Sequence, residues 1–553
     1  MQSLFEIIPE EIETLAYADD ITLIATSPFS RIARRKLQTA VDKIAAWAPT
    51  IGFTFAPEKS NLLHFGPHRK RLRKTPLLNL CNKTINLVRA SRILGVWVDD
   101  QLKFSNHINR VRKTANRKLN ILKKLCGRSF SGSRATLFLF VHGWLLPTML
   151  HGIGIFGRGY DYAIRKLAPA YNHAIRMISG AFKSSPIPSL MSESGQVPFE
   201  YILLKSLSAK TVRWLSFARD PAVPLIARTE MLLNEIQATI PHISPRNEPR
   251  LLKWNRKMPS VDLSLLSKVK AGENPSKVLP LFRHLSREKY GNVPKYYTDG
   301  SKTSDQRVGC GIHSENLNVS LSLPTTCSVF SLEAYALLST AFNYCPPSGS
   351  VVFSDSASVL KASFGGNVKH PWIAELSEVA VRKNITLCWV PGHSNIPGNE
   401  IADQLANVGT QMDPPNQAVP SPDAIKWLKQ KIKLSWSHEW NHIHDNKLRE
   451  VKNSTDTWND RKTVSERRIL TRLRIGHTRL THEYLMEKED PPVCIACKIP
   501  LSVKHIILNC PQYHQARVES GLADNLRQVL SNCPTGEKKI LTFLQKSKLI
   551  SRI

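Results

Sequence analysis

Short apolar strands alternate with amphipathic helices over residues 291–410, and this alternation constrains the fold more than any other feature. The segments YYTDG, GCGIH and NVSLSLP read as three strands of a meander, followed by a helix from about Ser328 to Tyr344 and a buried strand, SVVFSD. Two more helices, the strand ITLCWV and a last helix from about Pro397 to Val408 complete the pattern. This order predicts an α/β unit with a mixed five-stranded sheet.

Acidic residues mark the edges of these elements. Asp299 and Asp355 are predicted to end strands, Glu333 lies early in a helix, and Asp403 lies in the first turns of the last helix. An aspartate at a strand end is more often a turn former or a helix cap. Two-metal hydrolysis of a phosphodiester, however, needs carboxylates that converge on cations about 3.5–4 Å apart. Oxygen ligands suit Mg²⁺, with Mn²⁺ as an alternative, so the sequence predicts a divalent metal site here.

The residues around these acids resemble a known family. YTDGSK, SLEAYALLSTA, FSDSASVLKA and WVPGHSNIPGNEIADQLA occur in the order and at the intervals of type 1 ribonuclease H. The resemblance covers residues 291–410 and implies cleavage of the RNA strand of RNA–DNA hybrids, with two Mg²⁺ ions held by Asp299, Glu333, Asp355 and Asp403. His393 matches the family's mobile histidine, which implies a role in product departure or proton transfer, although a loop histidine often has no such role. Asn399 matches a position beside the site.

The charge of the chain predicts a polyanionic partner. The formal net charge is +32, which suits a nucleic acid or an acidic membrane surface. Residues 291–410 hold seven Lys or Arg against nine Asp or Glu, so the positive charge lies in the flanks. Residues 106–126 form a basic amphipathic helix, and a second basic segment follows Lys426. We expect these flanks to supply most of the affinity for RNA, DNA and hybrids, although such helices can also be merely solvated.

The N-terminal segment resembles part of a reverse transcriptase. LAYADDITLIA is similar to the YxDD motif, FAPEKSNLLHFG places Lys59 at the position of the family's lysine, and SRILGVWVDDQLKFSNHI resembles jockey-like non-LTR retrotransposon polymerases. The resemblance implies a C-terminal remnant of the palm at 1–105 and a helical thumb and connector at 106–245. Only sixteen residues precede Tyr17, too few for the palm's other aspartate and the fingers, so we expect no templated DNA synthesis from this chain as written.

A Cys/His cluster lies near the C-terminus, within a predicted module at 486–553. Its spacing suits tetrahedral Zn²⁺ bound by Cys494, Cys497, His505 and Cys510. The alternative is a set of buried side chains without a metal. Similar sequences end the open reading frames of jockey-like elements, which implies a structural zinc site that also contacts nucleic acid.

The remaining segments complete a multidomain α/β protein. Residues 246–290 are predicted to be a linker and residues 411–485 a basic helical region. The uncharged stretch 135–157 is long enough to span a membrane, but its central Pro147, its glycines and its histidines favour a buried helical hairpin, and we expect no membrane partner. The sequence lacks a secretory signal, so we expect an intracellular location, in the nucleus, the cytoplasm or both. The oligomeric state stays open.

Three functions fit this organisation. The first is a hybrid-specific endoribonuclease within a retrotransposon-derived protein. The second is a nucleic-acid-binding remnant in which the nuclease is silent. The third is a fragment of a full reverse transcriptase.

Overall fold

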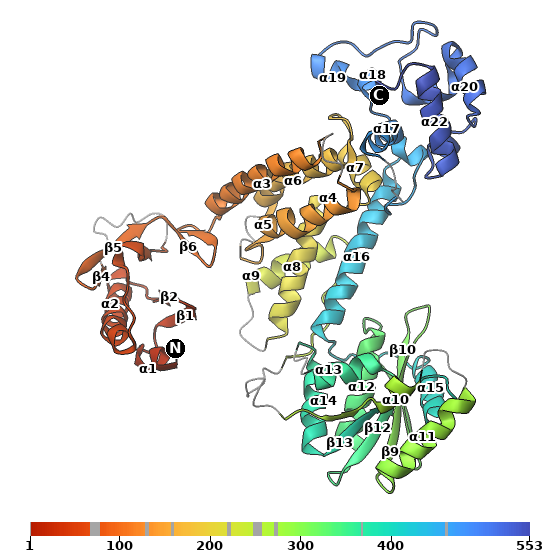
Figure 1. Ribbon diagram of the computed structural model, residues 1–553. Coiled ribbons are helices and arrows are strands. Elements are labelled where there is room, and N and C mark those ends of the chain that lie inside the picture. Colours follow the sequence, from red (N-terminus) through yellow and green to blue (C-terminus); the bar gives the residue numbers. More distant parts are fainter. Residues whose placement is uncertain are drawn as a thin grey trace. The chain divides into compact units, whose positions relative to one another are not determined.

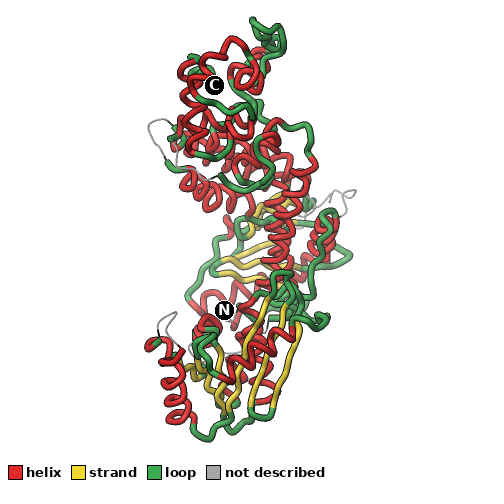
Figure 2. The backbone as a smooth tube through the Cα atoms, turned by 90° about the vertical axis from the view of Figure 1, so that its right-hand side faces the viewer, coloured by secondary structure: helices red, strands yellow, loops and turns green. Residues whose placement is uncertain are grey.

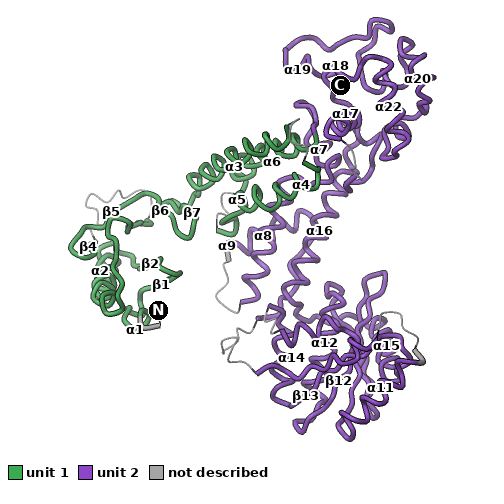
Figure 3. Tube along the Cα trace, in the orientation of Figure 1, with its two compact units in different colours: residues 1–179 green, residues 180–553 purple. Residues whose placement is uncertain are grey.

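The computed structural model describes the chain in two compact units. Met1–Ser179 form the first and Gly180–Ile553 the second (Figure 3). The described residues are 2–66, 78–127, 132–155, 160–217, 223–246, 257–269, 275–365, 369–458 and 463–553. Parts of the predicted linker, 247–256 and 270–274, lie outside them.

The first unit begins with small sheets and a helix. Its elements are α1 (Gln2–Ile7), β1 (Glu13–Tyr17), β2 (Asp20–Ile24), α2 (Ser30–Trp47), β3 (Asn61–Leu63), β4 (Leu78–Leu80), β5 (Lys83–Val88), β6 (Ala90–Ile93) and β7 (Val96–Asp99). β1 and β2 pair antiparallel with Tyr17 opposite Asp20, so Ala18 and Asp19 form a two-residue turn. Both Asp19 and Asp20 are exposed at the tip of this hairpin. Such a tight turn presents its polar side chains to solvent.

Helices make up the rest of the first unit. They are α3 (Ser105–Leu125), α4 (Arg134–Phe140), α5 (Leu146–Leu150) and α6 (Tyr160–Ser179). In α3 the apolar residues, Ile108, Val111, Ala115, Leu119 and Leu122 among them, are buried, and the basic residues occupy the other face. α3 packs against α6 within this unit. The predicted basic amphipathic helix is therefore present, because apolar residues three and four apart share one side of a helix.

The uncharged stretch 135–157 does not form the hairpin that the sequence predicts. Its described part runs from α4 through the π-helical turn η3 (Val141–Leu145) into α5. Pro147 lies just after the π-helical turn η3, and such a turn interrupts the regular i→i−4 hydrogen-bond ladder where a proline removes a donor. Among the described residues no helix has both the length and the apolar composition needed to cross a bilayer.

The second unit contains the α/β segment. Its strands are β8 (Ser260–Asp262), β9 (Lys295–Lys302), β10 (Val308–Ser314), β11 (Leu317–Ser322), β12 (Ser350–Ser354) and β13 (Ile385–Trp389), and its helices are α10 (Ser264–Lys268), α11 (Pro275–Tyr290), α12 (Val329–Ser339), η6 (Thr340–Tyr344), α13 (Ala357–Phe364), α14 (Pro371–Arg382) and α15 (Pro397–Gly409). They form one mixed sheet with the order β11-β10-β9-β12-β13-β8 (Figures 1 and 2). The predicted strands and helices of residues 291–410 are all present.

The sheet has six strands among the described residues, so the predicted five-stranded sheet is one strand short. The sixth strand, β8, pairs parallel with β13 and comes from the segment predicted to be a linker. Its Asp262 accepts hydrogen bonds from Lys289 Nζ at 2.9 Å and from the Tyr290 hydroxyl at 2.7 Å, which joins β8 to the end of α11. A strand of three residues carries no detectable alternation of its own, because its stability comes from this tertiary pairing.

Helices α7 (Ile187–Ser194), α8 (Phe199–Leu215), α9 (Val223–Asn234) and α16 (Ser421–His442) also belong to the second unit. α8 and α16 lie side by side (Figure 1). The Tyr201 ring on α8 lies 6.0 Å from that of Trp436, and its hydroxyl donates to Glu439 at 2.5 Å. α16 buries one residue per turn, namely Ala424, Leu428, Ile432, Trp436 and Trp440. This apolar line is what allows a strongly basic helix to pack.

A buried network of charged residues joins the C-terminal helices to α7. They are η7 (Lys447–Glu450), α17 (Val464–Ile475), α18 (Arg479–His482), α19 (Tyr484–Glu487), η8 (His505–Asn509), α20 (His514–Ser520), α21 (Leu526–Leu530) and α22 (Pro534–Lys546). Arg474 lies 3.5 Å from the Glu193 carboxylate on α7 and donates to Glu537 on α22 at 2.8 Å. The Trp458 indole donates to Glu193 at 2.6 Å. Buried charges require such partners, so these residues fix α7, α17 and α22 together.

Candidate active site and Cys/His cluster

Carboxylates from separate elements of the α/β segment meet at one place. Oxygen atoms of Asp299, Glu333 and Asp355 all lie within 4.8 Å of one another. Asp299 lies inside β9, opposite Gly311 of β10, so the strand continues past it where the sequence predicted an end. Glu333 is in α12, and Asp355 directly follows β12. Parallel pairing of β9 with β12 brings two of these acids to the same end of the sheet.

The electrostatics of this group are unfavourable without a cation. Burial and the charge of Asp355 raise the pKa of Asp299 to about 7, and a side-chain hydrogen bond with Asp403 adds to the rise. Burial, followed by repulsion from Asp299 and Asp355, also raises the pKa of Glu333. The Glu333 Oε2 atom is buried and has no hydrogen-bond partner among the described residues. Buried, repelling carboxylates with an unpaired oxygen are what a divalent cation would stabilise.

Asp403 reaches this group because α15 lies almost directly on β10. A Cβ atom added to Gly311 would lie 1.9 Å from the Ala402 carbonyl oxygen, and one added to Gly309 would lie 2.3 Å from that of Ala406. Glycine is therefore required at both positions for the helix to approach. Asp403 is not among the carboxylates that lie within 4.8 Å of one another, but its charge raises the pKa values of Asp299 and Asp355.

The loop before α15 places His393 beside the same group. Burial raises the pKa of Asp355, and the nearby His393 opposes that rise. His393 is exposed and has a backbone φ of +49°, in the left-handed region. Asn399, the other residue of the loop motif, is buried, and its Oδ1 atom has no hydrogen-bond partner among the described residues.

Two further residues at the site did not emerge from the sequence. A Cβ on Gly392 would lie 2.4 Å from Asp355 Oδ2, so glycine leaves room for that carboxylate. Asn407 donates to Asp403 Oδ1 at 3.4 Å and accepts from Ser301 at 2.6 Å, which orients the acid from one turn further along α15. The spacing of four residues between Asp403 and Asn407 was the available signal for the second contact.

The Cys/His cluster also comes together. Ligand atoms of Cys494, Cys497, His505 and Cys510 all lie within 4.8 Å of one another. The sulfur atoms of Cys494 and Cys510 are 3.7 Å apart. Two thiolates on a tetrahedral Zn²⁺ with Zn–S bonds of about 2.3 Å would be roughly 3.8 Å apart. The donor set and this distance therefore fit zinc.

Local structure favours the thiolate form of Cys494, whereas burial and the neighbouring thiols raise the pKa of Cys497. The Lys498 N–H donates to the Cys494 carbonyl at 2.8 Å, and Lys498 has a φ of +57°, so a tight turn holds the first pair of cysteines. The side chain of His505, followed by the Cys497 backbone N–H, lowers the pKa of Cys494. The thiolate form of cysteine is the metal ligand.

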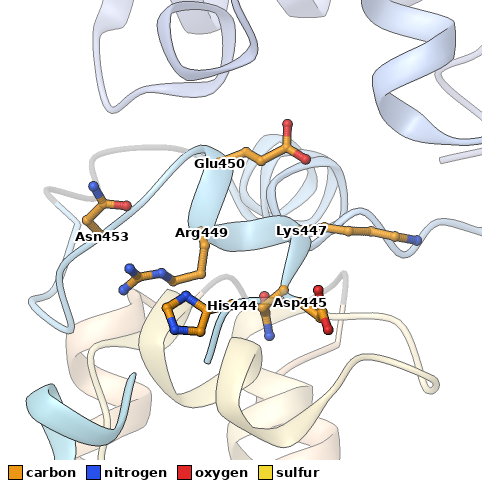
Figure 4. A pocket seen from close by; sticks show the side chains of 7 residues that line it. His444, Asp445, Lys447, Arg449, Glu450 and Asn453 are labelled. Carbon is orange, nitrogen blue, oxygen red and sulfur yellow. The ribbon is translucent and has the colours of Figure 1, made fainter. Parts of the chain in front are cut away.

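Two other features lie outside these clusters. A pocket around η7 is lined by His444, Asp445, Asn446, Lys447, Arg449, Glu450 and Asn453 (Figure 4). Glu450 points away from His444 in this view and pairs with Lys504 at 2.7 Å. The exposed pair Asp19 and Asp20 belongs to neither metal-type cluster of the described residues.

Comparison with known families agrees with this geometry. Residues 292–411 match the family model of RNase H. Strands β9 to β13 and the clustered carboxylates lie within that span, whereas β8, α10 and α11 precede it. The chain therefore carries an RNase H domain, which is a domain of the hydrolase class.

The curated relatives of this chain are proteins of mobile elements. The chain is 20% identical over 216 residues to the Retrovirus-related Pol polyprotein from type-1 retrotransposable element R1 2 of Nasonia vitripennis, which is 38% of this chain and 52% of that protein. It is 24% identical over 176 residues to the RNA-directed DNA polymerase from mobile element jockey of Drosophila melanogaster, 32% of this chain and 19% of that protein. The chain is thus similar to proteins of non-LTR retrotransposons of the R1 and jockey types, and it spans about half or less of the length of these relatives.

Proposed function

We propose that this protein is an endoribonuclease that cuts the RNA strand of RNA–DNA hybrids by two-metal hydrolysis. The observation that carries the proposal is the convergence of Asp299, Glu333 and Asp355 within 4.8 Å, with Asp403 acting on the same group. An ordinary turn-forming or capping role would not require buried carboxylates to face one another against their mutual repulsion. The match of residues 292–411 to RNase H supports the same reading.

The side chains suggest a division of work. Bound Mg²⁺ ions, or Mn²⁺ in their place, supply water activation and stabilise the leaving oxygen. Asp299, Glu333, Asp355 and Asp403 would hold them, and Asn407 keeps Asp403 oriented. His393, exposed and beside Asp355, would exchange a proton as the product leaves. RNA would be selected through its 2′-hydroxyl groups across the wide minor groove of the hybrid.

A cleavage assay tests this proposal. A labelled RNA–DNA hybrid is incubated with the full chain in Mg²⁺, beside the Asp299→Asn variant and a control, Asp305→Asn, which changes an exposed acid outside the site. We expect the wild type and the control to cut the RNA strand and the Asp299 variant to lose at least about 10²-fold in rate. Cutting by Asp299→Asn at the control's rate would refute the assignment.

A second candidate is a nucleic-acid-binding protein whose nuclease is silent. The formal charge of +32 favours it independently of the carboxylates. The same assay separates the two functions, because a silent nuclease would bind the hybrid and leave it intact.

For the Cys/His cluster we propose a structural Zn²⁺ site formed by Cys494, Cys497, His505 and Cys510. The tetrahedral spacing of the sulfur atoms supports it. With all four positions of the metal occupied by protein, such a site stabilises the fold and leaves no open position for catalysis.

For residues 1–245, which comprise the first unit and the start of the second, we propose descent from a reverse-transcriptase palm at residues 1–105, followed by a thumb and connector at 106–245. The exposed Asp19 and Asp20 at a hairpin tip and the basic face of α3 support this reading. The role proposed for α3 is contact with nucleic-acid phosphates. Neutralising Arg110, Arg117 and Lys124 should weaken RNA binding and reduce its dependence on salt, and unchanged binding would contradict that role.

A further inference from the structure

Lysines form a row along one face of α16, the helix that follows the RNase H domain. Lys426, Lys429 and Lys433 are all exposed. Their spacing of three and then four residues places them within about 60° of one another around the helix axis. From first to last they span about 10 Å along that axis. The phosphates of one nucleic-acid strand follow each other every ~3.4 Å along the duplex axis, so the row spans about three phosphate-to-phosphate steps.

A buried hydrogen bond joins α16 to the catalytic domain. Asp423, in the first turn of α16, accepts the backbone N–H of Ser328 at 3.0 Å and is buried. Ser328 is the N-cap of α12, and Glu333 lies five residues further on, about 7.5 Å along that helix. The first lysine of the row, Lys426, lies one turn beyond Asp423. The row therefore begins about one turn from the hydrogen bond between Asp423 and Ser328, which joins the start of α16 to the start of α12, the helix that carries Glu333.

The charge of the row is largely uncompensated. Lys433 lies 3.5 Å from Asp456, but within the described ranges no carboxylate lies within ion-pair distance of Lys426 or Lys429. Lys205 on the neighbouring helix α8 adds to the cluster. Its pKa is lowered by burial first and then by the charges of Lys433 and Lys429. Lysines that repel one another in this way gain most when a polyanion occupies the surface between them.

We propose that Lys426, Lys429 and Lys433, together with Lys205, form a docking surface for the phosphate backbone of the RNA–DNA hybrid beside the nuclease site. The inference rests on the proposed function for the identity of the nucleic acid. The RNase H domain itself holds more acidic than basic residues, so it needs such a surface nearby to retain its substrate.

Salt-dependent binding tests the proposal without chemistry. All variants carry Asp299→Asn, and the dissociation constant for a labelled hybrid is measured between 50 and 200 mM salt by fluorescence anisotropy. Replacing Lys426, Lys429 and Lys433 by glutamine should reduce the magnitude of the slope of log K against log salt concentration by about 2–3, where K is the association constant. Each phosphate contact contributes about 0.9 to this slope. Over this fourfold range of salt, the affinity of the parent should fall about 40-fold more than that of the variant.

A matched control removes the same charge from other surfaces. Lys431 lies on another face of α16, over the Trp427 ring at 5.5 Å, and Lys538 and Lys539 are exposed on α22. Glutamine at these positions should leave the slope within one unit of the parent. A row variant that behaves like this control would overturn the proposal and make the lysines a solvated face or a surface for a protein partner.

The two proposals fail separately. If the wild-type chain does not cut hybrids but the row variant still loses salt dependence, the nuclease assignment is wrong and the docking surface stands. If the wild type cuts and the row variant binds normally, the docking surface is wrong. With both correct, the row variant in an otherwise wild-type chain should show a raised KM and a kcat within about twofold of wild type.

Discussion

Replacing Gly311 by alanine tests whether the close approach of α15 to β10 brings Asp403 to Asp299. The added Cβ atom would lie 1.9 Å from the Ala402 carbonyl oxygen, whereas real Cβ contacts under 3.0 Å essentially never occur. Helix α15 therefore has to retreat by about 1 Å or more, and a misplacement of that size can cost about 10²-fold in rate. Overpacking of this kind also costs typically about 1–3 kcal/mol of stability.

The measurements are hybrid cleavage in Mg²⁺ and the free energy of unfolding of the full chain. A control is Gly291→Ala, whose Cβ would meet only the Arg287 carbonyl oxygen at an ordinary 3.8 Å. We expect Gly311→Ala to fold, to lose stability and to cut about 10²-fold more slowly, and the control to change neither property. A stable Gly311→Ala variant that cuts at the wild-type rate would show that this contact does not position Asp403.

Three further predictions concern the Asp299 carboxyl, the Cys/His cluster and strand β8. In magnesium-free buffer the Asp299 carboxyl holds its proton in the folded state up to about pH 7, against an ordinary pKa of 3.8, so its contribution to stability is present below pH 4 and is lost as pH rises to 7. The difference in thermal midpoint between wild type and Asp299→Asn, measured from pH 4 to 8, should show this loss. A difference that does not depend on pH would contradict the prediction. Cys510→Ala should abolish binding of one zinc per chain and make the C-terminal module sensitive to protease, whereas Cys533→Ala, at an exposed thiol, should do neither. Equal zinc contents in the two variants would exclude the site. Asp262→Ala leaves the Tyr290 hydroxyl without its acceptor and should cost about 1–3 kcal/mol in denaturant unfolding, and an unchanged midpoint would mean that β8 is not needed.

The elements of the RNase H domain could be predicted because each carries its own local signal. The strand before Asp355 is continuously buried around an apolar centre, and the helix that bears Asp403 begins with proline, so period and capping agree with the fold. The candidate Mg²⁺ ligands followed from the resemblance of the motifs around them to type 1 ribonuclease H. The grouping of the Cys/His cluster followed from its spacing, since its members lie within a short stretch of chain.

The features that could not be predicted depend on contacts between distant residues. β8 is recognisable only once β13 is in place beside it. The continuation of β9 past Asp299 depends on its ladder with β10, which overrides the local preference of an Asp-Gly pair for a turn. The cap that Asp423 supplies to α12 joins residues 95 positions apart, and no local pattern contains that information.

The buried carboxylate of Glu193 has a consequence for how this protein is made. Its partner Trp458 follows 265 residues later, and Arg474 comes later still. At about 5–20 residues per second, a ribosome needs roughly 13–53 s to cover that distance. During this interval α7 holds an acid that it cannot bury without cost, so its final packing waits until nearly the whole chain has been translated. The nuclease sheet, whose strands all precede Trp458 in the sequence, can form first, and truncated translation products would then retain a folded nuclease beside an unfolded α7.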